Sequence, residues 1–300
     1  MESMPTEAID PSLIDLDLQS NEQIISLLLA SQQRAVDAVS DAGGQLEAAI
    51  SQAADRLALN RGRLILVGAG ASGRLAVQDG AELWPTYGWP HDRLLLCMAG
   101  GPEALLASVE GVEDDPVAAA GDVEAAAVDE HDVVVALAAS GQSVWTCTWL
   151  ETSRQRGALA IGMASNPDTR LLRAADCPVF LDSGAEVLAG STRMSAGTAQ
   201  KIALNLFSTV LMIRLNRTYG NLMVDMAAVN KKLDKRRIRL LQGVLPRLDD
   251  EQARQAIDAA GGWVKLAVLI ALGDSATRAR QRLQEHHDSL RAAMEDCQPR

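Results

Sequence analysis

The feature of this chain that most constrains its fold is a series of short apolar runs in its central part. Each run has about the length of a buried β-strand, and longer segments of helical or loop-like character separate them. The runs cover residues 64–67, 94–97, 133–138, 159–163 and 179–181. Parallel strands need long crossover connections, which residues 72–84, 116–128 and 143–156 can supply. The pattern predicts an α/β fold built on a five-stranded parallel sheet.

Helical patterns precede and follow the predicted sheet. Residues 22–58 carry apolar side chains at helical spacing, and a break at Gly43 and Gly44 predicts two helices there. A long helical pattern covers residues 194–215, and the sequence becomes charged and helical after residue 231. We therefore expect an N-terminal helical segment that packs on the sheet domain, the sheet domain itself and a C-terminal helical subdomain, at residues 1–58, 59–235 and 236–300.

Composition and charge exclude several classes of protein. Hydrophobic residues make up 48% of the chain and charged residues 22%, which is typical of a folded globular protein. The formal net charge of −11 disfavours nucleic-acid binding. The four cysteines lack C-x-x-C spacing, so we predict neither a zinc site nor a disulfide framework. The N-terminus has no basic region before an apolar run, and no segment approaches 18 uninterrupted apolar residues, so we expect a cytoplasmic protein without membrane association.

A glycine-rich loop follows the first predicted strand. Residues 68–73 formally match G-x-G-x-x-G and open a helix, where backbone N–H groups and the helix dipole favour an anion. A dinucleotide site would need an acid at the end of the second strand, but that strand ends at Met98 and Ala99. The sequence therefore favours a smaller phosphorylated ligand over a nicotinamide cofactor, with Gly70, Ser72 and Gly73 as candidate binding residues.

A second glycine loop follows the third predicted strand and contains Ser140, Gly141 and Ser143. Loops at the carboxyl ends of adjacent parallel strands face one crevice, so the hydroxyl groups of Ser72, Ser140 and Ser143 could share one phosphate. Each serine is also suited to the commoner task of capping a helix. The two roles can coexist, because both use the unpaired N–H groups at a helix start.

A third cluster, residues 184–193, follows the fifth predicted strand and leads into the long helix. Its candidate ligand-binding residues are Glu186, Ser191, Thr192 and Arg193. The Arg193 guanidinium could pair with a phosphate or carboxylate of a ligand, or with acids of the protein itself, and its position in the sequence does not separate these alternatives.

Two carboxylates are candidates for acid and base chemistry. Glu82 ends the helix that begins at the first glycine loop, and an apolar, aromatic segment follows it, so burial there would raise its pKa. Glu113 lies in an acidic segment with Glu110, Asp114 and Asp115, which from the residues alone is more typical of a solvated helix end.

Together these motifs resemble the N-acetylmuramic acid 6-phosphate etherases of the sugar isomerase (SIS) domain superfamily. The resemblance extends over nearly the whole chain. Its segments are Thr6-Glu7, G-A-G-A-S-G-R-L at 68–75, P-T-Y-G at 85–88, V-E-G-V-E-D at 109–114, A-A-S-G at 138–141, G-S-T-R-M-S-A-G-T-A-Q-K at 190–201, Y-G-N-L-M-V-D at 219–225 and G-W-V-K-L-A-V at 262–268.

The resemblance implies a three-layer αβα sandwich of the SIS type, a homodimer and a phosphosugar bound at the carboxyl ends of the strands. It places Glu82 at the general acid/base of the family and Glu113 at its second catalytic acid. The implied enzyme is a carbon-oxygen lyase that cleaves the D-lactyl ether of N-acetylmuramic acid 6-phosphate by elimination and hydration. The products are N-acetylglucosamine 6-phosphate and D-lactate, in cell-wall amino sugar recycling, and no metal or redox cofactor takes part.

The chain departs from the family pattern mainly in the loops that would hold the ligand. Ala71 and Ala189 stand where threonine is usual, Trp84 and Trp145 occupy positions of other residue types, and Ser195 replaces a lysine. Loss of that cation would weaken recognition of a phosphate or lactyl carboxylate. The alternative function is therefore a SIS-domain sensor, regulator or isomerase for a different phosphosugar. The glucokinase regulatory proteins, which share the domain, are the non-enzymatic comparison.

Overall fold

The computed structural model describes residues 4–59, 61–226 and 231–297. The chain divides into two compact units. The first consists of Met1–Gly80 and Asp92–Ser208, and the second of Ala81–His91 and Thr209–Arg300. The domain boundaries expected at residues 58 and 235 stay predictions.

The first unit contains the predicted parallel sheet of five strands, in the order β2-β1-β3-β4-β5. The strands are β1 Leu64–Gly68, β2 Leu94–Met98, β3 Val133–Leu137, β4 Leu159–Ala164 and β5 Cys177–Phe180. Gly68, the last residue of β1, pairs with Met98 on one side and with Leu137 on the other. The strand order reverses between β1 and β3, so the loops that follow these two strands are neighbours at one edge of the sheet.

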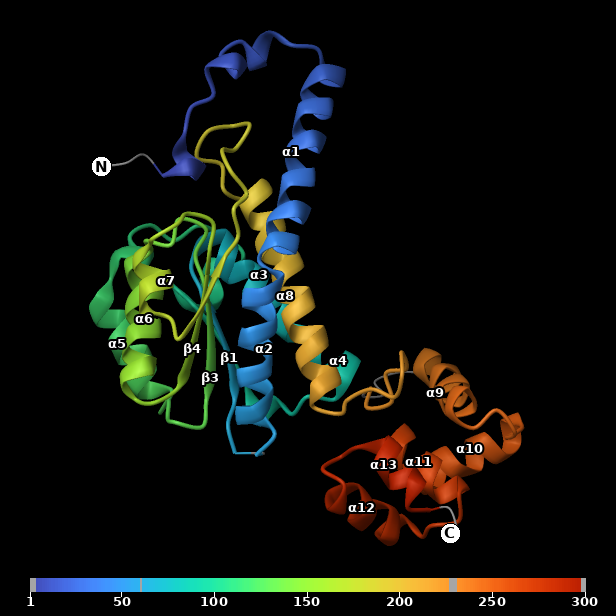
Figure 1. Cartoon of the computed structure of the whole chain (residues 1–300). Coiled ribbons are helices and arrows are strands. Elements are labelled where there is room, and N and C mark those ends of the chain that lie inside the picture. Colours follow the sequence, from blue (N-terminus) through green and yellow to red (C-terminus); the bar gives the residue numbers. More distant parts are fainter. Residues whose placement is uncertain (1–3, 60, 227–230, 298–300) are drawn as a thin grey trace. The chain divides into compact units, whose positions relative to one another are not determined.

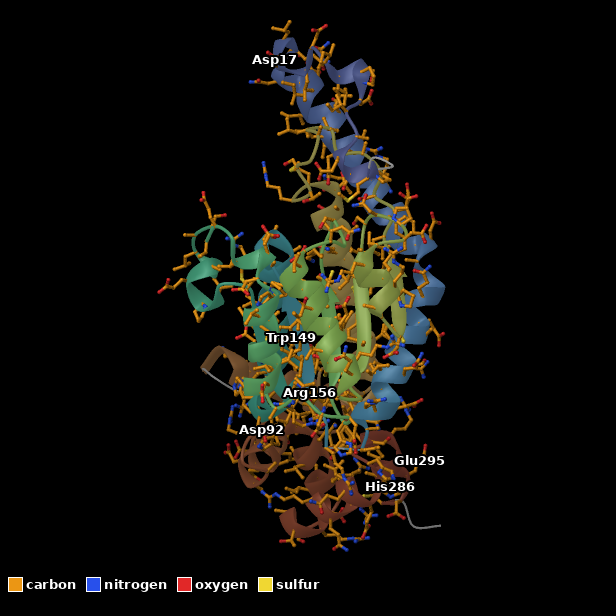
Figure 2. All side chains as sticks on the ribbon, turned by 90° about the vertical axis from the view of Figure 1, so that its left-hand side faces the viewer. Asp17, Asp92, Trp149, Arg156, His286 and Glu295 are labelled. Atoms are coloured by element: carbon orange, nitrogen blue, oxygen red, sulfur yellow. The ribbon has the colours of Figure 1, made fainter. Side chains whose placement is uncertain are left out.

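Helices cover both faces of the sheet, which confirms the three-layer αβα architecture (Figure 1). On one face lie α5 Pro116–Ala125, α6 Val144–Gln155 and α7 Arg170–Ala174; on the other lie α2 Gly43–Leu57, α3 Gly70–Ala81 and the first part of α8 Ser195–Arg214. Strand residues such as Ile65 and Val134 pack against Trp145 and Trp149 of α6 in one buried cluster. Trp149, labelled in Figure 2, is fully buried, and a buried side chain of this kind typically contributes about 3 kcal/mol of transfer free energy.

The two N-terminal helices form as expected, with the break at Gly43. The first, α1 Asn21–Asp41, begins with a capping box in which Ser20 and Gln23 satisfy each other's backbone N–H groups. The start of α1 and the segment around Asp17 lie far from the sheet (Figures 1 and 2). At the other end, α2 packs along the edge strand β5, where Oε1 of Gln45 accepts a hydrogen bond from the backbone N–H of Phe180 at 2.7 Å.

The second unit is helical and has its own core. Its helices are α4 Leu83–Tyr87, α9 Lys231–Val244, α10 Asp250–Ala259, α11 Val264–Ala271, α12 Ala276–Glu285 and α13 Leu290–Glu295, together with the end of α8. The core forms around α11, whose residues from Val264 to Leu269 are all buried. The expectation of short C-terminal helices is confirmed. Over the part of the chain that the structure describes, no helix is long and apolar enough to cross a membrane.

Candidate functional site

The first glycine loop turns the chain sharply from β1 into α3. A Cβ atom added at Gly73 would lie 2.6 Å from the carbonyl oxygen of Gly68, so a larger residue could not occupy this position without a backbone shift. Gly70 begins the helix with a φ of +52°. The tight turn places the N-terminus of α3 directly at the carboxyl end of β1, which is the arrangement that binds anions.

Ser72 of this loop is held by a residue far away in the sequence. Its hydroxyl donates a hydrogen bond to Oε1 of Gln200 on α8, with an Oγ to Oε1 distance of 2.8 Å. Both side chains are buried, and Gln200 is 0% exposed. The amide nitrogen Nε2 of Gln200 is also buried and has no hydrogen-bond partner among the described residues. The sequence singled out Ser72 but gave no signal for its contact with Gln200.

The second glycine loop has the same kind of turn between β3 and α6. Gly141 has a φ of +68°, and a Cβ atom there would lie 2.3 Å from Oγ1 of Thr169. Oγ of Ser143 caps α6 by accepting from the backbone N–H of Thr146, and Oγ of Ser140 accepts from that of Gln142 at 3.2 Å. The capping role predicted as an alternative for Ser143 is thus observed.

The N-terminal segment and the third cluster meet at the second glycine loop. The backbone N–H of the buried Thr6 donates to Oδ1 of Asn166, which follows β4, at 3.1 Å. Nδ2 of Asn166 donates to the carbonyl oxygen of Ser140 at 3.3 Å. The carbonyl oxygen of Thr6 in turn accepts from the backbone N–H of Gly190 at 3.2 Å. Sequence reasoning did not identify Asn166, because an isolated asparagine after a strand carries no distinctive pattern.

The third cluster supports the start of α8. Glu186 is 1% exposed, and its two carboxylate oxygens accept from the backbone N–H groups of Ser195 and Ala196, each at 2.9 Å. A carboxylate at this end of a helix is stabilised by the helix dipole. Ser195 is itself fully buried, with its hydroxyl 2.9 Å from that of Ser31. The substrate contact expected of Glu186 stays a prediction, since its carboxylate already satisfies α8.

The remaining residues of the third cluster are more accessible. Ser191 and Thr192 are half-buried, and Arg193 is exposed. Arg193 forms no ion pair with any described residue, so its guanidinium is available to a ligand.

The two candidate carboxylates are both exposed. Glu113 lies in the 3-10 helix Val112–Asp114, and its carbonyl oxygen is 3.5 Å from Oγ of Ser143, so the structure brings this segment to the second glycine loop. Glu82 belongs to the second unit, where it precedes α4 and makes no capping hydrogen bond through its side chain. It is exposed rather than enclosed by the apolar residues that follow it.

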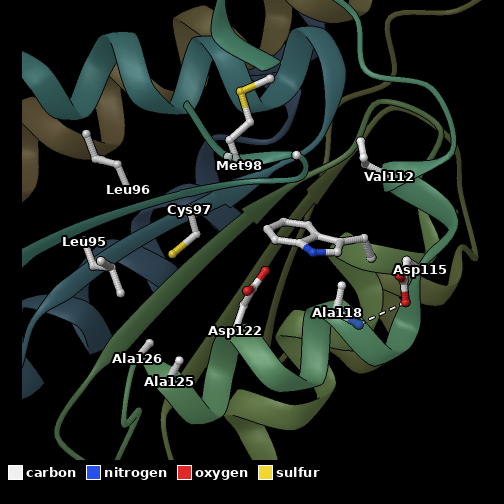
Figure 3. A pocket seen from close by; sticks show the side chains of 13 residues that line it. Leu95, Leu96, Cys97, Met98, Val112, Asp115, Ala118, Asp122, Ala125 and Ala126 are labelled. Atoms are coloured by element: carbon white, nitrogen blue, oxygen red, sulfur yellow. Dashed lines mark hydrogen bonds between the residues drawn. The ribbon is translucent and has the colours of Figure 1, made fainter. Parts of the chain in front are cut away.

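A cavity of about 520 Å³ lies beside the edge strand β2 and α5 (Figure 3). Cys97, Val112, Asp122 and Trp145 are among its lining residues, and the carboxylate of Asp115 at its rim accepts from the backbone N–H of Ala118 at 2.9 Å. Burial raises the pKa of the Cys97 thiol to about 12, so this thiol is not an active nucleophile. No predicted site residue lines this cavity. Among the described residues, no group of three or more His, Cys, Asp or Glu side chains is placed to hold a metal ion.

Comparison with known protein families identifies the domain. Residues 104–210 match the family described as the SIS domain. Residues 28–151 match the N-terminal SIS domain of glucokinase regulatory protein.

Full-length relatives narrow the assignment. An N-acetylmuramic acid 6-phosphate etherase of Deinococcus radiodurans is 46% identical, over 93% of this chain and 91% of that protein. The etherase of Streptomyces avermitilis is 41% identical over 98% of this chain and 94% of its own length. That of Salmonella agona is 38% identical over 98% of both chains. The chain therefore carries a SIS domain and belongs to the N-acetylmuramic acid 6-phosphate etherase family.

Proposed function

We propose that this protein is a carbon-oxygen lyase that cleaves the D-lactyl ether of N-acetylmuramic acid 6-phosphate. The products are N-acetylglucosamine 6-phosphate and D-lactate, and the reaction belongs to the recycling of cell-wall amino sugars. The observation that carries this proposal is the nearly full-length similarity to etherases, at 46% identity for the Deinococcus radiodurans protein. It covers the glycine loops and both candidate carboxylates.

The phosphate of the substrate binds at the crevice between β1 and β3. The N-termini of α3 and α6 both begin at loops on this edge of the sheet, so their backbone N–H groups and dipoles favour an anion there. Gly70, Gly73 and Gly141 form the tight turns that lead into these helices, while Ser72, Ser140 and Ser143 contribute hydroxyl groups. Each hydroxyl donor to a charged oxygen contributes about 1.5–3 kcal/mol.

The third cluster completes recognition of the substrate. Arg193 is exposed and unpaired among the described residues, so its guanidinium can form charge-assisted hydrogen bonds with the phosphate or the lactyl carboxylate. Ser191 and Thr192 precede it on the same loop. Glu186 contributes through the N-terminus of α8, which its carboxylate holds in place, and its own contact with the sugar is part of this proposal.

The chemistry needs a proton acceptor and a proton donor. Opening of the sugar ring leaves the C2 proton beside an aldehyde, where it is acidic. Glu82 removes this proton, a C2–C3 double bond forms and the C3–O bond breaks, so D-lactate leaves with the bonding electron pair. Glu113 donates a proton to the leaving oxygen and takes one back from the water that adds at C3, while Glu82 returns a proton to C2. A carboxylate in such a role typically accelerates a reaction about 100- to 10,000-fold.

The enzyme acts as a homodimer in which a neighbouring subunit completes the site. Ile25, Leu29 and Val36 lie on one side of α1 and are exposed, with Leu29 at 65%. An exposed apolar stripe of this kind is typical of a protein interface. The cytoplasm is the proposed location, and the free state of Cys97, Cys147, Cys177 and Cys297 suits a reducing compartment.

A second candidate function is the sensing or isomerisation of a different phosphosugar. It is favoured by the match of residues 28–151 to the domain of glucokinase regulatory protein and by Ser195, which removes a cation from the family pattern. The two functions share the phosphate site and differ in chemistry.

Incubation with N-acetylmuramic acid 6-phosphate, followed by an assay for free D-lactate, distinguishes them. The etherase function predicts equal amounts of D-lactate and N-acetylglucosamine 6-phosphate. Tight binding of another hexose phosphate, with no lactate released at high enzyme concentration, would support the second candidate.

A further inference from the structure

The hydrogen bond between Ser72 and Gln200 conflicts with the task proposed for Ser72. A serine hydroxyl has one proton to donate, and Ser72 donates it to Oε1 of Gln200, with Oγ and Oε1 2.8 Å apart. A phosphate oxygen can only accept hydrogen bonds. In the observed arrangement Ser72 therefore presents lone pairs, not a donor, to any anion in the first glycine loop.

Gln200 can reverse the direction of this bond. A half-turn about the last torsion of its side chain exchanges the positions of Oε1 and Nε2. Nε2 would then donate to Oγ of Ser72, and the Ser72 proton would be free for the ligand. The observed orientation leaves the buried Nε2 without a hydrogen-bond partner among the described residues, so this donor is already available.

The surroundings of Gln200 favour a rotation of the amide over a movement of the helix. The N-terminus of α8 is fixed by Glu186 through Ser195 and Ala196, five and four residues before Gln200. Gly197 is fixed to the carbonyl oxygen of Thr192 at 2.8 Å. The start of α8 is thus anchored, and rotation of the Gln200 amide alone is enough to reverse the bond to Ser72.

We propose that Gln200 is a positioning residue for Ser72. Its amide accepts a hydrogen bond from the Ser72 hydroxyl in the observed orientation and donates one to Ser72 Oγ in the rotated orientation, which leaves the Ser72 proton to the phosphate of a bound phosphosugar. This inference rests on the proposed function, because it requires a phosphosugar at the first glycine loop. A residue that merely ties α3 to α8 would need only the observed bond.

The substitution Gln200→Glu separates the two roles. An ionised carboxylate has nearly the shape of the amide and keeps the observed bond, but it cannot donate to Ser72. A positioning role predicts that KM for N-acetylmuramic acid 6-phosphate rises about ten- to a hundredfold while kcat changes little. It also predicts a KM that falls again at low pH, where the introduced carboxyl is protonated and can donate.

Two further variants distinguish an effect through the Ser72 hydroxyl from direct repulsion between the introduced carboxylate and the phosphate. In a Ser72→Ala background, Gln200→Glu should raise KM less than about threefold, because its effect passes through the Ser72 hydroxyl. Gln32→Glu is the matched control. Oε1 of Gln32, on α1, accepts from the hydroxyl of Thr198, which lies on α8 as Gln200 does, and Nε2 of Gln32 is likewise buried without a hydrogen-bond partner among the described residues. This variant should keep the KM of the unaltered protein.

An NMR measurement on the unaltered protein tests the inference even if Gln200→Glu does not fold. The side-chain amide NMR signal of Gln200, identified by its loss in Gln200→Met, should shift when N-acetylglucosamine 6-phosphate is added to the unaltered protein. It should shift far less in Ser72→Ala. The inference is overturned by a normal KM in Gln200→Glu, by an undiminished effect in the Ser72→Ala background, or by an amide signal that ignores the ligand. Failure of the unaltered protein to release D-lactate and to bind any phosphosugar would instead refute the proposed function.

Discussion

Nζ of Lys265 donates a hydrogen bond to Oδ2 of Asp225 at 2.5 Å, and both side chains are almost fully buried in the second unit. Nη1 of Arg217 lies 3.4 Å from the same oxygen. Burial raises the pKa of the Asp225 carboxyl, while the nearby charges of Lys265 and Arg217 oppose this rise. The structure of the second unit therefore depends on keeping these charges together.

Loss of Lys265 should destabilise the protein strongly. Lys265→Met leaves Asp225 buried without its closest cation, and breaking a buried ion pair in this way costs about 3–5 kcal/mol. Urea denaturation followed by circular dichroism measures the change. Arg254→Met, which breaks the exposed pair with Glu251, should change the free energy of unfolding by less than about 1 kcal/mol. Equal effects of the two variants would contradict the role given to the buried pair.

A second ion pair should make stability depend on pH. Arg282 donates to both oxygens of Asp274, at 2.8 and 3.2 Å, and these bonds lower the pKa of the Asp274 carboxyl. A lowered pKa contributes stability that is present above the unfolded-state value of about 3.9 and is lost as the pH falls through the folded-state value. The unaltered protein should therefore be more stable than Asp274→Asn at pH 7, and the difference should shrink below about pH 4. A difference that stays constant from pH 7 to pH 3 would rule this out.

The serines of the glycine loops should contribute to phosphosugar affinity. Ser72→Ala and Ser140→Ala each remove one hydroxyl donor, so each should weaken the binding of N-acetylglucosamine 6-phosphate by about 1–3 kcal/mol. Titration calorimetry measures the affinity, and inorganic phosphate should compete. Ser51→Ala, on the exposed side of α2, is the control and should bind normally. Unchanged binding in both loop variants would mean that these hydroxyl groups serve only their contacts within the protein, with Gln200 and with the backbone N–H of Gln142.

Glu113 and Glu110 provide a matched pair of acids. Both are exposed in the same segment, but only Glu113 has its carbonyl oxygen close to Ser143. Glu113→Gln should lower kcat by about 100-fold or more with little effect on stability. Glu110→Gln should leave kcat unchanged. A similar loss in both variants would indicate a general effect of the acidic segment rather than catalysis by one carboxylate.

The strands of the sheet could be predicted because buried parallel strands leave continuous apolar runs. The runs at 64–67 and 94–97 each fall one residue short of the observed β1 and β2. The helix α7 Arg170–Ala174 was not predicted, because its five residues are too few for a helical period to show. It follows Asp168, whose φ of +51° is unusual for a residue other than glycine, and no sequence pattern indicates that conformation.

The parts of the candidate site that lie within one loop could be predicted from the sequence. Contacts between residues far apart in the sequence could not. The glycine loops show their turns directly in the sequence. The contact of Ser72 with Gln200 joins residues 128 positions apart, and that of Thr6 with Asn166 joins residues 160 apart. Glu186 was predicted as a ligand-binding residue because it lies in a loop with a ligand-binding pattern. That pattern does not reveal that the Glu186 carboxylate accepts hydrogen bonds from the N-terminus of α8.

Solvent deuterium at C2 of the product tests the central claim most directly. The reaction is run in deuterium oxide with N-acetylmuramic acid 6-phosphate, and the N-acetylglucosamine 6-phosphate formed is examined by NMR. If Glu82 removes the C2 proton, this proton exchanges with solvent before water adds, and Glu82 then delivers a deuteron to C2 of the product. Glu82→Gln should keep its fold and its phosphosugar binding while turnover falls about 10,000-fold or more. A product without deuterium at C2, or near-normal turnover by Glu82→Gln, would contradict the account.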